Sequence, residues 1–79
     1  MLIRSQNKEL LVNFNVSAGI EIKERNAKTV VTLYITGCSC LLGEYSTKAK
    51  AMKVLDMIQE ACVNGHIDYQ MPEDSEVEE

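Results

Sequence analysis

Hydrophobic and polar residues alternate along the first half of the chain with the two-residue period of a β-strand that buries one face. Apolar side chains occupy every second position of residues 10–16, and the alternation resumes at Ile20 and Ile22 after a Ser-Ala-Gly break. Residues 29–36 are rich in β-branched and aromatic side chains, which favour strands. We therefore expect one strand followed by a hairpin.

Further extended segments are indicated on either side of this region. Gly37 permits a turn into residues 38–45, which lead the chain towards a helix. Residues 2–5 can pair with the first predicted strand across a short polar turn, which makes an N-terminal hairpin. The alternation in residues 67–71 indicates a last strand, and Pro72 ends any pairing.

The spacing of apolar residues changes to that of an amphipathic helix between residues 47 and 63. Ser46 or Thr47 can cap its first turn with a side-chain oxygen, and Asn64-Gly65 supplies the left-handed residue that commonly ends a helix. The apolar positions recur at intervals of three and four and form one stripe, which we expect to be buried: Ala51, Val54, Leu55, Ile58 and Cys62.

Together these elements predict an α+β fold, an antiparallel β-meander of about five short strands with the helix packed on one face. Seventy-nine residues make one domain, which we place at residues 1–72. Five of the twelve acidic residues lie in residues 73–79, so we expect a disordered acidic tail. Without that tail the chain is near neutral, which argues against a globally basic nucleic-acid binder.

The compartment follows from the N-terminus and the cysteines. Charged Arg4 and Lys8 interrupt the first residues, so the apolar stretch of a secretion signal is missing, and no later run reaches membrane-spanning length. Three cysteines, an odd number, then indicate reduced thiols rather than a disulfide framework. We expect a cytoplasmic protein with no membrane partner and no cofactor.

The thiols and the single histidine allow one metal-binding alternative. Cys38 and Cys40 fall on the same side of an extended segment, and Cys62 with His66 could complete a Cys3His zinc site. The spacing typical of zinc knuckles is absent, however, and Cys62 lies on the stripe expected to be buried. Ordinary reduced cysteines are therefore the favoured interpretation. Because no glycine motif indicates an oxyanion hole beside a thiol, we expect no enzyme.

A cationic patch is the candidate binding surface. Lys48, Lys50 and Lys53 crowd the first two turns of the predicted helix, where the macrodipole disfavours positive charge. Such a conflict can mark a surface that binds phosphate or an acidic partner, and it offers a landing site for the acidic tail. The competing interpretation, a solvated helix face with three long side chains, is the favoured one.

Four segments carry a resemblance: residues 3–8 (IRSQNK), 42–48 (LGEYSTK), 50–56 (KAMKVLD) and 70–72 (QMP). They resemble a group of small uncharacterised proteins from Gram-positive bacteria and their phages or mobile elements. The group has no established activity, so the resemblance carries over no functional residue. It implies an accessory protein of a mobile element rather than a housekeeping enzyme.

These observations predict a small non-enzymatic interaction module. We expect it to bind an unidentified protein, or a second copy of itself, through a sheet edge or the polar helix face. The alternative is a nucleic-acid or phosphate ligand bound by Lys48, Lys50 and Lys53. Nucleic acid is the less favoured partner because the chain has few cations and its aromatic residues fall mostly in patterned strands.

Overall fold

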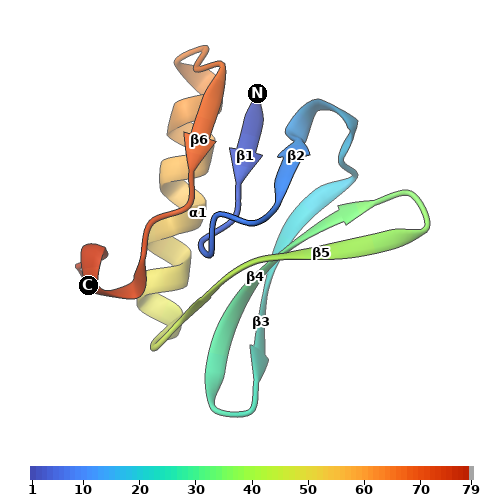
Figure 1. Cartoon of the computed structure of the whole chain (residues 1–79). Coiled ribbons are helices and arrows are strands. Elements are labelled where there is room, and N and C mark those ends of the chain that lie inside the picture. The colour runs from blue at the N-terminus through green and yellow to red at the C-terminus, as the bar shows by residue number, and fades with distance from the viewer. Residues whose placement is uncertain (79) are drawn as a thin grey trace.

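The structure is a computed structural model that describes residues 1–78, in which the chain forms six strands and one long helix. Two three-stranded sheets lie against the helix α1 (Lys48–Val63), as Figure 1 shows, and the α+β class is confirmed. The strands are β1 (Leu2–Arg4), β2 (Leu11–Asn13), β3 (Gly19–Arg25), β4 (Lys28–Ile35), β5 (Cys38–Tyr45) and β6 (Asp68–Gln70). Two short 3₁₀ turns, η1 (Phe14–Val16) and η2 (Asp74–Glu76), complete the elements.

The first sheet has the order β2-β1-β6, with β1 antiparallel to β2 and parallel to β6. The prediction of one meander of about five strands is therefore wrong, because the described residues form six strands in two sheets. Parallel neighbours need a long connection, and here the whole second sheet and α1 lie between β1 and β6. Alternation shows that a segment is extended, but it does not identify the neighbouring strand.

The predicted strand over residues 10–16 is shorter than expected. After β2 the chain enters η1, and the Asn13 side-chain oxygen accepts a hydrogen bond from the Asn15 backbone N–H at 3.0 Å. An Asn side chain that binds the backbone two residues ahead competes with sheet pairing, which explains the early end of β2.

The second sheet has the order β3-β4-β5 and is antiparallel throughout, so the predicted hairpin is confirmed. Asn26 and Ala27, both with positive φ (49° and 65°), connect β3 to β4, as a two-residue hairpin turn requires. Figure 1 shows this turn at the lower end of the second sheet, beyond the N-terminal end of α1. The left-handed conformation is costly for alanine, by roughly 1–2 kcal/mol.

The helix begins and ends as its sequence predicts. Oγ1 of Thr47 accepts from the Lys50 backbone N–H at 3.2 Å, which identifies Thr47 as the N-cap. At the other end Gly65 has a φ of 74°, and the backbone N–H groups of Gly65 and His66 donate to the carbonyl oxygens of Cys62 and Ala61. These two bonds form a Schellman motif.

The buried stripe of α1 is rotated from the predicted one. Ala51, Val54 and Ile58 are buried as expected, and Ala61 joins them. Leu55 is only half-buried, and Cys62, expected in the core, is exposed. Both stripes fit helical spacing because apolar residues cover more than one face, and packing against two sheets selects the one through Val54 and Ala61.

The C-terminal segment differs from the predicted disordered tail. Val77 is only 4% exposed and belongs to the same core as Ile3 and Tyr45. The Glu73 side chain accepts from the Glu76 backbone, and Glu76 Oε1 accepts from the Glu73 N–H at 2.8 Å, which forms a capping box. The apolar anchor Val77 explains why residues 73–77 follow the domain. Glu79 lies outside the described residues.

No helix within the described residues is long and apolar enough to cross a membrane.

Candidate functional site

The three lysines of the predicted cationic patch do not share one face of α1. Successive helical residues are turned by about 100°, so Lys48 and Lys50 lie about 160° apart around the axis. Nζ of Lys50 lies 3.1 Å from the Asp74 carbonyl oxygen and 3.5 Å from its carboxylate, so an internal partner takes up this charge. Lys48 lines a hollow of about 360 Å³ beside the β3–β4 turn, and Lys53 is exposed. These lysines therefore form no single surface.

The alternative zinc ligands are also not brought together. Cys38 and Cys40 lie on β5, whereas Cys62 is near the end of α1 and His66 follows its stop. Cys38 and Cys62 are exposed, and Cys40 packs partly against the core. In residues 1–78 no three His, Cys, Asp or Glu side chains are close enough together to hold a metal ion.

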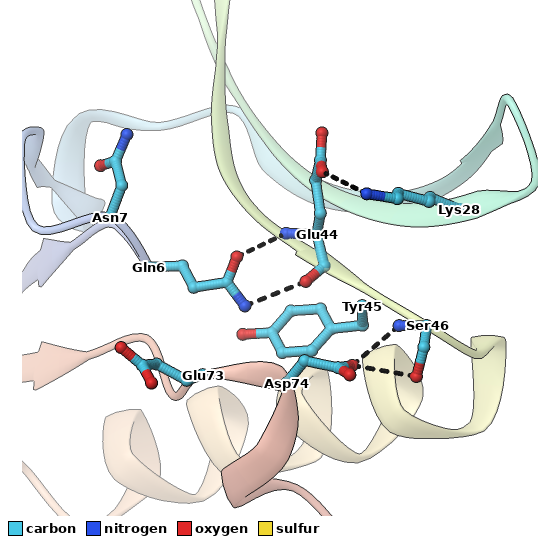
Figure 2. Close-up of a pocket in the computed structure, with 8 residues that line it drawn as sticks. All are labelled: Gln6, Asn7, Lys28, Glu44, Tyr45, Ser46, Glu73 and Asp74. Carbon is cyan, nitrogen blue, oxygen red and sulfur yellow. Dashed lines mark hydrogen bonds and ion pairs between the residues drawn. The ribbon is translucent and has the colours of Figure 1, made fainter.

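A hollow of about 430 Å³ lies where the β1–β2 turn, the end of β5 and the C-terminal segment meet. We call it the Gln6 corner, after the residue that organises it together with Glu44, Tyr45, Ser46 and Asp74. Figure 2 shows the Gln6 side chain pointing at the backbone of Glu44, and Asp74 reaching Ser46 from the C-terminal segment.

Gln6 closes half of the β5 edge. Its side-chain nitrogen donates to the Glu44 carbonyl oxygen at 2.9 Å, and its oxygen accepts from the Glu44 backbone N–H at 3.0 Å. Its own backbone N–H donates to the Leu42 carbonyl oxygen at 2.7 Å. One side-chain amide thus replaces a peptide group of a neighbouring strand. A Cβ at Gly43 would lie 3.2 Å from the Gln6 Cβ, so glycine permits this approach.

The other side of the corner fastens the C-terminal segment. The Tyr45 hydroxyl donates to the Pro72 carbonyl oxygen at 2.7 Å, and burial raises the pKa of this phenol well above its ordinary value. The Asp74 carboxylate accepts from the Ser46 backbone N–H at 2.8 Å and from its hydroxyl at 3.1 Å. The Ser46 backbone bond chiefly lowers the pKa of Asp74 below 3.8. The corner therefore prefers a charged Asp74.

The polar groups of the Gln6 corner are satisfied by one another. Lys28 Nζ, from the neighbouring strand β4, lies 3.8 Å from the Glu44 carboxylate (Figure 2). In the part of the chain that the structure describes, no buried side-chain nitrogen or oxygen lacks a hydrogen-bond partner. Because its side chains bond to backbone groups of separate segments, we interpret the corner as a structural joint.

An apolar groove lies on the opposite flank of the second sheet. It measures about 330 Å³, and α1 lines it together with η1 and the first half of β3. We call it the α1 groove and define it by Phe14, Ile20, Leu55, Cys62 and Val63. Phe14, Ile20 and Leu55 are half-buried, whereas Val63 is 78% exposed. Apolar side chains at a concave surface favour association with another apolar surface.

The groove adjoins the edge of the second sheet formed by β3. This strand has seven residues and pairs with β4 on one side. Its outer face carries Glu21 and Lys23, whose charged atoms lie 3.7 Å apart, and Lys23 Nζ lies 5.1 Å from the centre of the Tyr34 ring. On its inner face Ile20 and Ile22 are partly buried against the core. No other strand of residues 1–78 pairs with the second side of β3.

The sequence patterns predicted neither the Gln6 corner nor the α1 groove, for different reasons. Gln6 and Asp74 act through contacts with residues 38 and 28 positions away, so no local spacing reveals them. A signal for the α1 groove was present, because Leu55 and Cys62 make the apolar surface of the helix wider than one face. Excess apolar width on a helix indicates either a second packing surface within the domain or a contact outside it.

No protein-family model matches the chain, and comparison with curated proteins and with solved structures finds no similar protein.

Proposed function

We propose that this protein is a small non-enzymatic interaction module that binds an extended protein segment along the open edge of β3. The proposal rests on one observation: the seven-residue strand β3 has no neighbouring strand on one side within the described residues, and the α1 groove lies beside it. Backbone hydrogen bonds to the edge supply affinity in this mode of recognition, and side-chain pockets supply specificity. The α1 groove is suited to take one or two apolar side chains of the bound segment.

We further propose an accessory role in a phage or mobile element, on the resemblance of residues 3–8, 42–48, 50–56 and 70–72 to proteins of that origin. Proteins that act by binding need no preorganised reactive groups, and both polar clusters described above are engaged within the chain. The Gln6 corner holds the C-terminal segment, and Lys50 is paired with Asp74.

Selection from a display library of random 12-residue peptides tests the proposal. We expect enriched peptides to shift the NMR signals of β3 and of the α1 groove. Leu55→Lys should weaken binding at least about tenfold, because a half-buried apolar contact becomes charged. Leu11→Lys, the same change on the exposed β2 of the other sheet, is the matched control and should bind normally. Peptides that map elsewhere, or the absence of any enriched peptide, would contradict the proposal.

A nucleic-acid or phosphate ligand is the competing function, and the dispersed lysines argue against it. Binding carried by phosphate contacts falls steeply with salt. We expect no titratable binding of a mixed-sequence RNA or DNA oligonucleotide even at low salt. Salt-dependent binding that Lys48→Ala weakens would instead favour this competitor.

A further inference from the structure

We infer that the natural occupant of the β3 edge is β3 of a second copy of this chain, paired antiparallel about Ile22 in a symmetric dimer. The inference rests on the proposed function, because it names the partner of that same edge. The resulting sheet would have six continuous strands with the β3 strands at its centre. A two-fold axis perpendicular to the sheet would place both α1 helices on the same face.

Length favours β3 over the other edges of the described residues. The exposed edges of the first sheet, β2 and β6, have three residues each. Gln6 occupies β5 at Leu42 and Glu44, which leaves the uncharged residues 38–41. β3 offers seven residues, and an antiparallel partner can bond to every second one.

The charge pattern of β3 is complementary to itself in one register. When Ile22 faces Ile22 of the partner subunit, Glu21 lies opposite the partner's Lys23, and symmetry repeats this pair. Directly opposite side chains have Cβ atoms about 4.5–5.5 Å apart, close enough for oppositely charged groups to stabilise the pair. All seven residues of each strand are paired in this arrangement.

Neighbouring registers are disfavoured by the same charges. A slip that keeps the faces of the sheet aligned moves the axis to Glu21 or to Lys23. Glu21 would then face Glu21 of the partner subunit, or Lys23 would face the partner's Lys23, and like charges directly opposite are destabilising. The Lys23 register also sets Glu21 opposite the partner's Arg25, whereas the register about Ile22 sets no like charges opposite each other. Both side chains are about half exposed in the monomer, 56% and 47%, so their internal ion pair can rearrange.

The apolar face of β3 is suited to the same axis. Ile22 lies on the side of the sheet that α1 covers and is only partly buried. At the axis it would contact Ile22 of the partner subunit and extend the apolar layer from one copy into the other. Because both helices lie on that face, the two α1 grooves would approach the interface from either side.

Charge reversal tests the register. We expect sedimentation equilibrium of the unmodified protein to show the mass rising from 8.9 kDa towards twice that value with concentration. Glu21→Lys and Lys23→Glu should each raise the dimer dissociation constant about tenfold, because two attractive pairs become repulsive. An equimolar mixture of the two variants should restore dimerisation, because each strand then faces its opposite charge.

Matched controls are Glu60→Lys and Lys53→Glu, which make the same charge changes on exposed positions of α1 and should leave dimerisation unchanged. Circular dichroism verifies that every variant is folded. A protein that stays monomeric at all concentrations overturns the inference, and so does a dimer that the mixture fails to restore. Selected peptides that still bind the β3 edge in either case would leave the proposed function standing.

Discussion

The second sheet has two edges, and within residues 1–78 they differ in how far other parts of the chain bond to them. At the β5 edge a single side chain, Gln6, bonds to both backbone groups of Glu44, and the C-terminal segment is fastened beside it through Tyr45. At the β3 edge no strand of the described residues pairs with the outer backbone groups, and the neighbouring groove is apolar. Proteins generally protect long edges, and this difference between the β3 and β5 edges is the basis of the proposed contact at β3.

The largest effect on stability is expected beside the β5 edge, where Tyr45 fastens the C-terminal segment. Tyr45 is 1% exposed, and Tyr45→Ala would remove a buried ring together with the bond to Pro72. We expect a loss of about 3–5 kcal/mol in the free energy of unfolding, measured by urea titration. For a domain of this size such a loss removes most of the stability. A loss below about 1 kcal/mol would show that the corner does not hold the fold together.

A smaller loss of unfolding free energy is expected when the Gln6 side chain is removed. Gln6→Ala exchanges the side-chain bonds to the exposed Glu44 backbone for bonds to water, which should cost about 0.5–1.5 kcal/mol. Exchange of the Glu44 amide hydrogen should also become faster. Gln59→Ala, the same substitution on an exposed helix position, should change the free energy of unfolding by less than about 0.5 kcal/mol. Equal losses of unfolding free energy in Gln6→Ala and Gln59→Ala would contradict the role assigned to Gln6 at the β5 edge.

Asp74 makes the closed side sensitive to pH. Its pKa in the folded chain is below the ordinary 3.8, chiefly because of the Ser46 backbone bond. The stabilisation is therefore complete above the unfolded pKa and is lost as pH falls through the lower folded value. Asp74→Asn should lower the midpoint of thermal unfolding at pH 7, and its difference from the unmodified protein should shrink below about pH 4. A difference that stays constant to pH 2.5 would contradict the role assigned to this carboxylate.

The smallest effect on stability is expected beside the β3 edge, in the α1 groove. The sequence pattern places Leu55 in the core, where truncation to alanine costs about 2–5 kcal/mol. In the structure Leu55 is half-buried in the α1 groove, so we expect Leu55→Ala to cost about 1 kcal/mol or less in the monomer. Urea titration at a concentration low enough to keep the chain monomeric measures this value. A loss of about 2–5 kcal/mol would instead support the predicted stripe, in which Leu55 belongs to the core.

Local periodicity predicted the segments whose structure depends on local chemistry. The hairpin of β3 and β4, the Thr47 cap and the stop at Gly65 all follow from residues close in the chain. Arrangements that depend on distant partners were not predictable in this way. The pairing of β6 with β1 and the rotation of α1 are choices among several apolar surfaces that one sequence pattern permits equally.

The candidate site was predictable to a lesser degree. A sheet edge was expected as a contact surface, but the pattern could not show which edge stays open, because Gln6 acts across the molecule. The lysine patch was read from spacing along the chain, whereas helical geometry separates Lys48 from Lys50 and Asp74 pairs with the latter. The acidic residues of the C-terminal segment led to a prediction of disorder. Val77 among them is buried, and its burial orders the segment that carries Asp74.

Amide hydrogen exchange, followed by NMR over a range of protein concentrations, tests the contrast between the two edges most directly. We expect the Glu44 amide to be protected at every concentration, because its acceptor is Gln6 of the same chain. Alternate amides of β3 should exchange fast in dilute protein and become protected as the concentration rises. Protection of every β3 amide in the most dilute sample, or fast exchange at all concentrations, would contradict an open edge that a second copy occupies.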